Sequence, residues 1–254
     1  MSELDRASSS SCFSDEDSVL LSEPSGGAYA VVGLIAAGKS TAIKALMSRY
    51  PNDYVMSPEP TYAVNKLLGK FYAANNEKEP EQEDKRRQLA ARRSQLTLSV
   101  QVSFLTARLS EQYACLEEQR RSGRKIIMDR DAYTDPEIFP KLALEKGRMS
   151  QEDYDCYKQV WDHSVRPHKW MRPNGIIYLR VSPETAMAQC KKRNSSEEEG
   201  LPLSYMQELY DMHENMIKKF VAEGEIPVHV IDADAGNKKM TVEEVAEAMR
   251  EIVQ

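Results

Sequence analysis

Residues 33–41 read GLIAAGKST, with two glycines, a lysine and two hydroxyl residues at fixed spacing. Gly33, Gly38, Lys39 and Ser40 fit the phosphate-loop pattern G-x4-G-K-[ST]. In such a loop the glycines let backbone amides point inward at phosphate oxygens, and the following helix adds its N-terminal dipole. An accidental match is expected in roughly one chain in a hundred of this length. The stretch therefore predicts a bound phosphate.

The sequence on both sides of this loop has the strand–loop–helix order that the pattern requires. Residues 28–32, AYAVV, form a short apolar run typical of a buried strand. After the loop, Ile43, Leu46 and Met47 share one face of a helical pattern. Further short apolar runs alternate with helical patterns, which favours one α/β domain whose five-stranded parallel sheet has helices on both faces. The expected strands are 28–32, 54–56, 125–129, 175–181 and 227–232.

Helix boundaries are indicated by periodic apolar residues and by capping residues. The longest helical pattern runs from Leu98 to Leu116 at spacings of three or four, and Ser-Gly at 122–123 ends it. The charged stretch NNEKEPEQEDKRR at 75–87 is expected to be an exposed loop. The expected capping or first positions of later helices are Ser182 with Pro183, Pro202, and Thr241 with Glu244 as a capping box.

Composition narrows the class of protein. The chain has 254 residues, a net charge of −6 and a pI of about 5.4, so no whole-surface binding to nucleic acid is expected. The four cysteines form no CxxC pair, which favours reduced thiols in the cytoplasm. No apolar run is long enough to span a membrane. Residues 1–27 are acidic and serine-rich and are expected to be a disordered tail, with one domain at 28–254.

The sequence favours transfer of the phosphate over its hydrolysis by a GTPase. Neither Asn65-Lys66 nor Asn237-Lys238 continues to the aspartate of a guanine-reading NKxD motif. A kinase for a small molecule needs groups that take a proton from the acceptor alcohol and neutralise developing charge. Glu59, Asp129 and Arg130 follow expected strands, where ligands bind in open parallel sheets. These residues predict a P-loop kinase.

Several segments in a fixed order resemble one family of such kinases. They are GLIAAGKST, Glu-Pro at 59–60, Gln101 with Arg108, DRDAYTD at 129–135, YLRVSPET at 178–185 and EEEGLPLSYMQELYDMHE at 197–214. Together they resemble the deoxyribonucleoside kinases, most of all the deoxycytidine and deoxyguanosine kinases, over residues 28–254. The resemblance implies transfer of the γ-phosphate of ATP to a deoxynucleoside 5′-hydroxyl for nucleotide salvage, with Mg2+, in a homodimer.

The resemblance also implies roles for individual residues. Glu59 would be the general base on the 5′-hydroxyl, and Arg130 would contact the reacting oxygens. Gln101 would read the edge of cytosine or adenine with its donor and acceptor, beside an Arg108–Asp135 pair that favours these bases over thymine. The other implied residues are Ser40 and Asp129 for the metal, Phe139 for stacking on the base, Tyr72 and Glu198 for the sugar 3′-hydroxyl, and Gly33, Ala36, Ala37, Gly38, Lys39, Ser40, Thr41 and Arg193 for ATP.

The chain departs from the family pattern at several positions. Asp131 stands where the family has a serine, Val64 replaces a tryptophan, and an insertion at about 75–88 separates Tyr72 from Gln101. The lid expected at about 188–200 lacks two of the family's three arginines. Its positions read Gln189, Arg193 and Ser195, with Lys191 and Lys192 alongside. Lysine carries charge but lacks the bidentate fork of a guanidinium, so weaker clamping of the donor or a shifted lid is expected.

Two alternatives to this function stay open at this stage. A nucleoside monophosphate kinase of thymidylate type needs basic groups near Glu59 for the acceptor phosphate, and SPEPTYAV at 57–64 offers none. A non-catalytic P-loop interaction protein has no need of Glu59, Asp129 and Arg130 together. The residues alone do not select among deoxycytidine, deoxyadenosine and deoxyguanosine.

Overall fold

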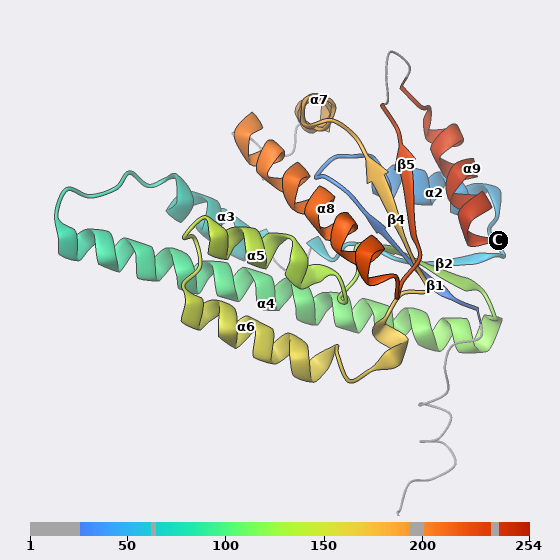
Figure 1. Ribbon diagram of the computed structural model, residues 1–254, viewed down its shortest axis with the longest axis horizontal. Helices are drawn as coiled ribbons and strands as arrows, with labels where there is room; N and C mark the ends of the chain where they lie inside the picture. The colour runs from blue at the N-terminus through green and yellow to red at the C-terminus, as the bar shows by residue number, and fades with distance from the viewer. Residues whose placement is uncertain (1–25, 62–64, 194–200, 235–238) are drawn as a thin grey trace, which may run out of the picture.

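The fold is an open parallel sheet between two layers of helices (Figure 1). The computed structural model describes residues 26–61, 65–193, 201–234 and 239–254. Within them the strands lie in the order β2-β3-β1-β4-β5, and every pairing is parallel. The expected five-stranded parallel sheet is thus confirmed. The strands are β1 (Ala28–Val32), β2 (Tyr54–Ser57), β3 (Lys125–Asp129), β4 (Gly175–Arg180) and β5 (Val228–Asp232).

Helices cover both faces of the sheet, as expected. α2 and α9 pack on each other along one face, whereas α4 and α8 lie along the other (Figure 1). α5 and α6 pack outside α4, and α7 contacts α8. The helices are α2 (Lys39–Arg49), α3 (Asn65–Asn76), α4 (Glu83–Ser122), α5 (Phe139–Glu145), α6 (Gln151–Ser164), α7 (Pro183–Arg193), α8 (Leu203–Glu223) and α9 (Val242–Val253), with 3-10 turns η2 (Asp135–Glu137) and η3 (Lys169–Met171). Within the described residues, no helix has both the length and the apolar character needed to cross a bilayer.

The expected capping positions are confirmed. The Ser182 hydroxyl accepts from the Thr185 amide at 3.2 Å at the start of α7. Thr241 and Glu244 form a capping box before α9. Gly123 ends α4 in the left-handed conformation, with φ of 72°. The sequence predicts these helix boundaries because a cap requires a particular residue type at one position, and that requirement does not depend on contacts with distant residues.

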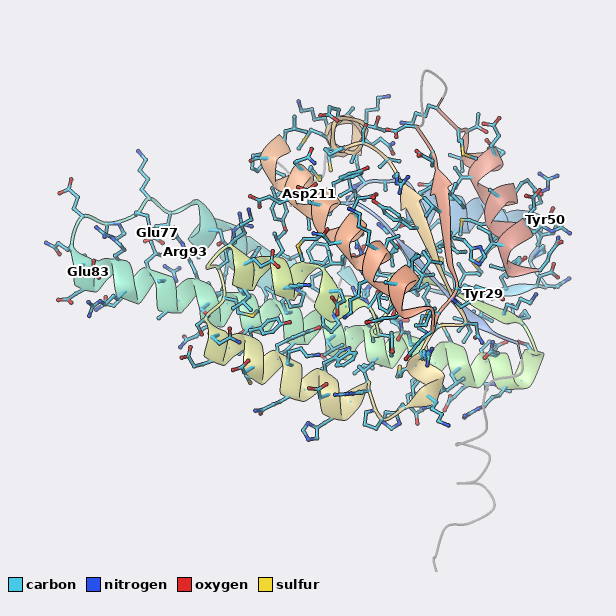
Figure 2. The ribbon with its side chains drawn as sticks, in the orientation of Figure 1. Tyr29, Tyr50, Glu77, Glu83, Arg93 and Asp211 are labelled. Carbon is cyan, nitrogen blue, oxygen red and sulfur yellow. The ribbon has the colours of Figure 1, made fainter. Side chains whose placement is uncertain are left out.

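The expectation of a loop over residues 75–87 is wrong at both ends. α3 continues to Asn76, and α4 begins at Glu83, so its first turns project from the body beside the end of α3 (Figures 1 and 2). Glu83 pairs with Arg86 and Arg87 at helical spacing, and Glu83 itself lies where acidic groups favour a helix start. The helix thus begins without an apolar stripe. α5 was also missing from the sequence expectations.

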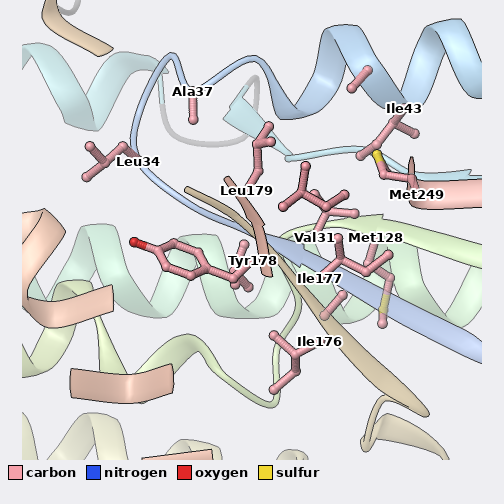
Figure 3. Packing of buried hydrophobic residues seen from close by; sticks show 14 of the residues in the cluster. Val31, Leu34, Ala37, Ile43, Met128, Ile176, Ile177, Tyr178, Leu179 and Met249 are labelled. Carbon is pink, nitrogen blue, oxygen red and sulfur yellow. The ribbon is translucent and has the colours of Figure 1, made fainter. Parts of the chain in front are cut away.

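The core lies mainly between the sheet and its helices. Val31 of β1, Ile127 of β3 and Ile177 of β4 are fully buried, and Figure 3 shows side chains of the central strands meeting Ile43 of α2 and Met249 of α9. The central strands have no solvated face, which explains their continuous apolar sequences. This packing holds the carboxyl ends of the strands at one edge of the sheet.

Strand register brings distant motifs together at that edge. β1 lies between β3 and β4, with Val31 opposite Asp129 and Val32 opposite Tyr178. The amide of Arg130 donates to the carbonyl of Val31 at 3.0 Å. The phosphate loop that follows β1 therefore begins beside the end of β3.

We expect Ile177→Ala to lower the free energy of unfolding by about 2–5 kcal/mol, because it removes a buried side chain from the central sheet. Chemical denaturation followed by circular dichroism measures this change. Val221→Ala is the matched control, because Val221 is 61% exposed, and it should change the same free energy by less than about 0.5 kcal/mol. Equal effects of the two substitutions would contradict this account of the core.

Candidate active site

A cavity of about 430 Å3 opens at the carboxyl edge of the sheet. The phosphate loop and the end of α7 form one end, whereas α3 and α4 form the other. This is the place where open parallel sheets bind ligands. The lining residues are Ile35, Ala36, Ala37, Gly38, Lys39, Ser40, Thr41, Glu59, Thr61, Leu68, Phe71, Val100, Gln101, Phe104, Arg108, Arg130, Phe139, Gln189, Lys192, Arg193 and Tyr205.

The phosphate loop depends on its two glycines. Gly33 has φ of 150°, and a Cβ there would lie 2.5 Å from the carbonyl oxygen of Leu179. Gly38 has φ of 95° and precedes the first residue of α2. Side chains at these positions are excluded, at Gly33 by a backbone clash and at both by conformation. The amides at the start of α2 thus remain close to the cavity, where a phosphate can accept from them.

Lys39 is buried at the base of this loop. Its ammonium donates to the carbonyls of Leu34 at 3.0 Å and Gly33 at 3.4 Å. Burial, with the nearby Arg130 guanidinium, lowers the pKa of Lys39 to about 8, although Asp129 and Glu59 oppose this shift. The lysine is therefore cationic at neutral pH and close to its titration range.

Ser40 and Asp129 meet beside Lys39. The Ser40 hydroxyl donates to Oδ2 of Asp129, and Asp129 is 1% exposed. Its other oxygen, Oδ1, has no hydrogen-bond partner among the described residues. The described residues contain no group of three or more His, Cys, Asp or Glu side chains placed to hold a metal ion. One carboxylate and one hydroxyl fit Mg2+, which in phosphoryl-transfer sites takes few protein ligands together with substrate phosphates.

Glu59 lies between three cationic side chains. Nε of Arg130 is 2.9 Å from Oε1 of Glu59, and Nη2 of Arg108 is 3.9 Å from the same oxygen. Arg130 Nε makes no hydrogen bond within the described structure, so its contact with Glu59 is an ion pair. Burial alone raises the pKa of Glu59, but Arg130, Lys39 and Arg108 outweigh burial and lower it below the usual value. The carboxylate is ionised at neutral pH and can accept a proton.

Arg130 adopts an uncommon backbone conformation. Its φ is 64°, which a non-glycine residue rarely adopts, and strain of this kind concentrates at functional sites. The guanidinium lies over the Phe139 ring with 4.9 Å between Cζ and the ring centroid. The side chain is thereby held over the cavity, between Glu59 and Phe139.

The expected Arg108–Asp135 pair is present and buried. One Asp135 oxygen contacts Nη1 of Arg108, and the other accepts from the Tyr157 hydroxyl. Burial opposes the charge on Arg108, but Asp135 and Glu59 raise its pKa above the usual value. Arg108 and Gln101 both line the cavity from α4, whereas Asp135 lies behind Arg108 and off the cavity wall. Burial, the negative charge of Asp135 and the hydrogen bond that the Tyr157 hydroxyl donates to it raise the pKa of Tyr157, which therefore stays neutral.

Asp131, a departure from the family pattern, stabilises the turn after β3. Its carboxylate accepts from the Thr134 amide at 2.8 Å and from the Thr134 hydroxyl at 2.6 Å. Burial raises the pKa of Asp131, and these two hydrogen bonds oppose the shift. The side chain thus fixes the backbone between Arg130 and Asp135.

The other expected site residues lie at the rim or outside the described structure. Phe139 and Arg193 line the cavity, as does Lys192. In the amide orientation that satisfies both neighbours, Gln189 donates to the Ala36 carbonyl at 2.9 Å and accepts from Lys239 at 2.8 Å. The last turns of α7 are therefore tied to the phosphate loop. The structure does not describe the remaining expected positions, which are the tail at 1–25, Val64, Ser195, Glu198 and the side chain of Tyr72.

The sequence did not reveal the apolar residues of the cavity wall or the buried polar side chains around the site. Leu68, Phe71, Val100 and Phe104 line the cavity, but in the sequence they were indistinguishable from core residues. His213 is fully buried on α8, with Nδ1 2.7 Å from the Leu209 carbonyl, and burial lowers its pKa to about 3. Tyr157 and Tyr205 were also missed, because only folding brings their helices to the site.

Comparison with known proteins defines the class. The family model "Deoxynucleoside kinase" matches residues 29–254. The deoxyadenosine/deoxycytidine kinase of Bacillus subtilis is 26% identical over 230 residues, covering 91% of this chain and 94% of the relative. Human deoxycytidine kinase is 25% identical and covers 80% of this chain and 82% of its own. A solved deoxyadenosine kinase from M. mycoides, with products dCMP and a flexible dCDP bound, has a TM-score of 0.66 at 24% identity, over 89% of this chain and 98% of that one.

The chain belongs to the deoxynucleoside kinase family. It is a phosphotransferase whose substrates are a nucleoside and a nucleotide. The likeness to the M. mycoides structure agrees with the observed fold. Family membership disfavours the non-catalytic alternative.

We expect nucleotide affinity to fall as pH rises through about 8, because Lys39 then loses the charge that attracts phosphate. Calorimetric titration of ATP should give constant affinity below about pH 7 and a loss approaching tenfold per unit above about pH 8.5. Lys39→Arg is the matched control, since arginine keeps its charge across this range. A profile for the native protein as flat as that of Lys39→Arg would contradict the assignment of a titrating Lys39.

Proposed function

We propose that this protein transfers the γ-phosphate of ATP to the 5′-hydroxyl of a deoxyribonucleoside, with deoxycytidine or a purine deoxynucleoside favoured over thymidine. The product is the 5′-monophosphate, made for nucleotide salvage. The observation that carries the proposal is the position of Glu59, an ionised carboxylate between the phosphate loop and the α4 wall of one cavity. The enzyme acts as a homodimer, which the resemblance implies, in the cytoplasm, which the cysteine pattern favours.

Glu59 is the general base in this proposal. It accepts the 5′-hydroxyl proton as the oxygen attacks the γ-phosphorus, and Arg130, 2.9 Å away, stabilises the carboxylate before transfer. As Glu59 takes the proton, the Arg130 charge is freed to face the transferring phosphoryl group. Lys39 and the amides at the start of α2 hold the donor phosphates.

Ser40 and Asp129 would hold Mg2+. The buried Oδ1 of Asp129, without a hydrogen-bond partner among the described residues, supports this role. When bound, the ion neutralises negative charge on the β- and γ-phosphates. Arg193, at the end of α7, would contact the same donor phosphates from the rim of the cavity.

Gln101 and Arg108 would recognise the base, and Phe139 would stack on it. The Gln101 amide offers one donor and one acceptor, which match the edge of cytosine or adenine. Arg108 is held by Asp135 and presents its remaining donors toward the cavity. The deoxycytidine and deoxyadenosine kinases among the relatives support this choice of bases. Tyr72 and Glu198 would hold the sugar 3′-hydroxyl.

A thymidylate-type kinase is the weaker candidate. The cations nearest Glu59 are Arg108 and Arg130, and Asp135 and Glu59 pair with them. An acceptor phosphate would have to displace one of these carboxylates, at the cost of a buried unpaired charge. Measuring phosphate transfer to dTMP beside the nucleosides distinguishes the two reactions.

Glu59→Gln should lower kcat by about 100-fold to 10,000-fold, because the amide cannot take the proton. Nucleoside binding, measured by calorimetry, should change little, since the amide keeps the size of the side chain. Glu184→Gln, an exposed carboxylate on α7, is the matched control and should leave turnover unchanged. Unchanged turnover in Glu59→Gln would refute the assignment of the base.

Arg108→Met combined with Asp135→Ala should shift the substrate ranking toward thymidine. A panel of the four deoxynucleosides at fixed ATP measures the ranking as kcat/KM for each. The two changes are made together because either alone leaves a buried unpaired charge, which costs about 3–5 kcal/mol of stability. A double variant that folds and keeps the native ranking would show that this pair does not select the base.

A further inference from the structure

We propose that Arg93 is a positioning residue that fixes α3 against α4 and thereby sets the nucleoside end of the cavity. This inference rests on the proposed nucleoside kinase function. Arg93 lies in the part of α4 that projects from the body, and Figure 2 shows it near Glu77, across from the end of α3. It does not line the cavity itself.

The Arg93 guanidinium caps α3 from the neighbouring helix. Its Nε donates to the Ala74 carbonyl at 2.9 Å, its Nη2 donates to the Glu77 carbonyl at 2.5 Å, and its Nη1 pairs with the Glu79 carboxylate. Carbonyls in the last turn of a helix lack partners within that helix, and a cation there also interacts favourably with the dipole. One side chain thus joins the α3 C-terminus, the 77–82 loop and α4.

The other ion pairs of this region are of a different kind. Arg92 pairs with the Glu77 side chain at 3.2 Å, and both groups are about half exposed, at 58% and 48%. Such surface pairs contribute little to stability. The Arg93 side chain is only 16% exposed, and within the described residues it, unlike Arg92, donates a hydrogen bond to an α3 carbonyl. The neighbouring arginines therefore offer a direct comparison.

The apolar packing between α3 and α4 is a small cluster. Within the described residues it has two buried members, Leu68 and Val100, and Leu67, Phe71 and Phe104 pack against them while only partly buried. Leu68 and Phe71 of α3 also line the cavity, facing the site from the side opposite the phosphate loop. A small shift of α3 therefore changes the cavity wall directly, with no change in the phosphate loop.

The test compares Arg93→Met with Arg92→Met. With deoxycytidine or deoxyadenosine as substrate at saturating ATP, Arg93→Met should raise the nucleoside KM by roughly fivefold to twentyfold. KM for ATP and kcat should stay within about twofold, because the donor site is untouched. Arg92→Met should match the native enzyme. Arg93→Lys, which keeps the positive charge but replaces the guanidinium fork with a single ammonium, should give an intermediate nucleoside KM.

Hydrogen exchange supplies a readout independent of catalysis. Amides of α3 should exchange faster in Arg93→Met, whereas those of the central sheet and α2 should not. Unchanged α3 exchange, or equal effects of Arg93→Met and Arg92→Met on the nucleoside KM, would overturn the proposal. If Arg93→Met does not fold, the Arg93→Lys variant decides by the same two measurements. A native enzyme without nucleoside turnover would defeat the proposed function instead, and exchange would still report on Arg93.

Discussion

The site depends on the close approach of Gly33 to β4. A Cβ at this position would lie 2.5 Å from the Leu179 carbonyl oxygen, so only glycine fits where the chain leaves β1. This turn also decides which residues the phosphate loop meets at the edge of the sheet. Because β1 lies between β3 and β4, the phosphate loop begins beside Asp129 and Arg130. Ser40 then reaches Asp129, and the phosphate loop lines the same cavity as Glu59 and Gln101.

Electrostatics makes that cavity suited to a negatively charged donor and a neutral acceptor. Lys39, Arg108 and Arg130 are all buried there, and burying like charges together is costly without anions. Glu59, Asp129 and Asp135 supply part of the compensation. The balance is unequal along the cavity. Asp135 neutralises Arg108 at the α4 end, whereas among the described residues the Lys39 ammonium donates only to loop carbonyls. The loop end therefore favours a phosphate, whereas the paired Arg108 at the other end suits the uncharged base that we propose binds there.

The sequence predicted the parts whose signals are local. Strand and cap positions and the phosphate loop were readable because each depends on residue type at fixed spacing. The meeting of Arg108 with Asp135 was expected only from the family resemblance, because the two residues lie far apart in sequence. The start of α4 at Glu83 was not readable, because ion pairs and not an apolar stripe continue that helix. The cavity wall at Leu68 and Phe104 was also hidden, since an apolar residue facing a ligand has the same pattern as one facing the core. The roles of individual site residues are still predictions.

The departures from the family pattern have physical explanations where the structure describes them. Asp131 replaces a serine, yet its carboxylate accepts two hydrogen bonds from Thr134 and fixes the turn that carries Arg130. Gln189 stands where relatives have an arginine, and it joins α7 to the phosphate loop through the Ala36 carbonyl. An amide can make that neutral contact without adding charge. Gln189 therefore holds α7 against the loop, while Lys192 and Arg193 supply positive charge at the rim of the cavity. The positioning of α7 and the positive charge at the rim thus come from different, neighbouring residues of this helix.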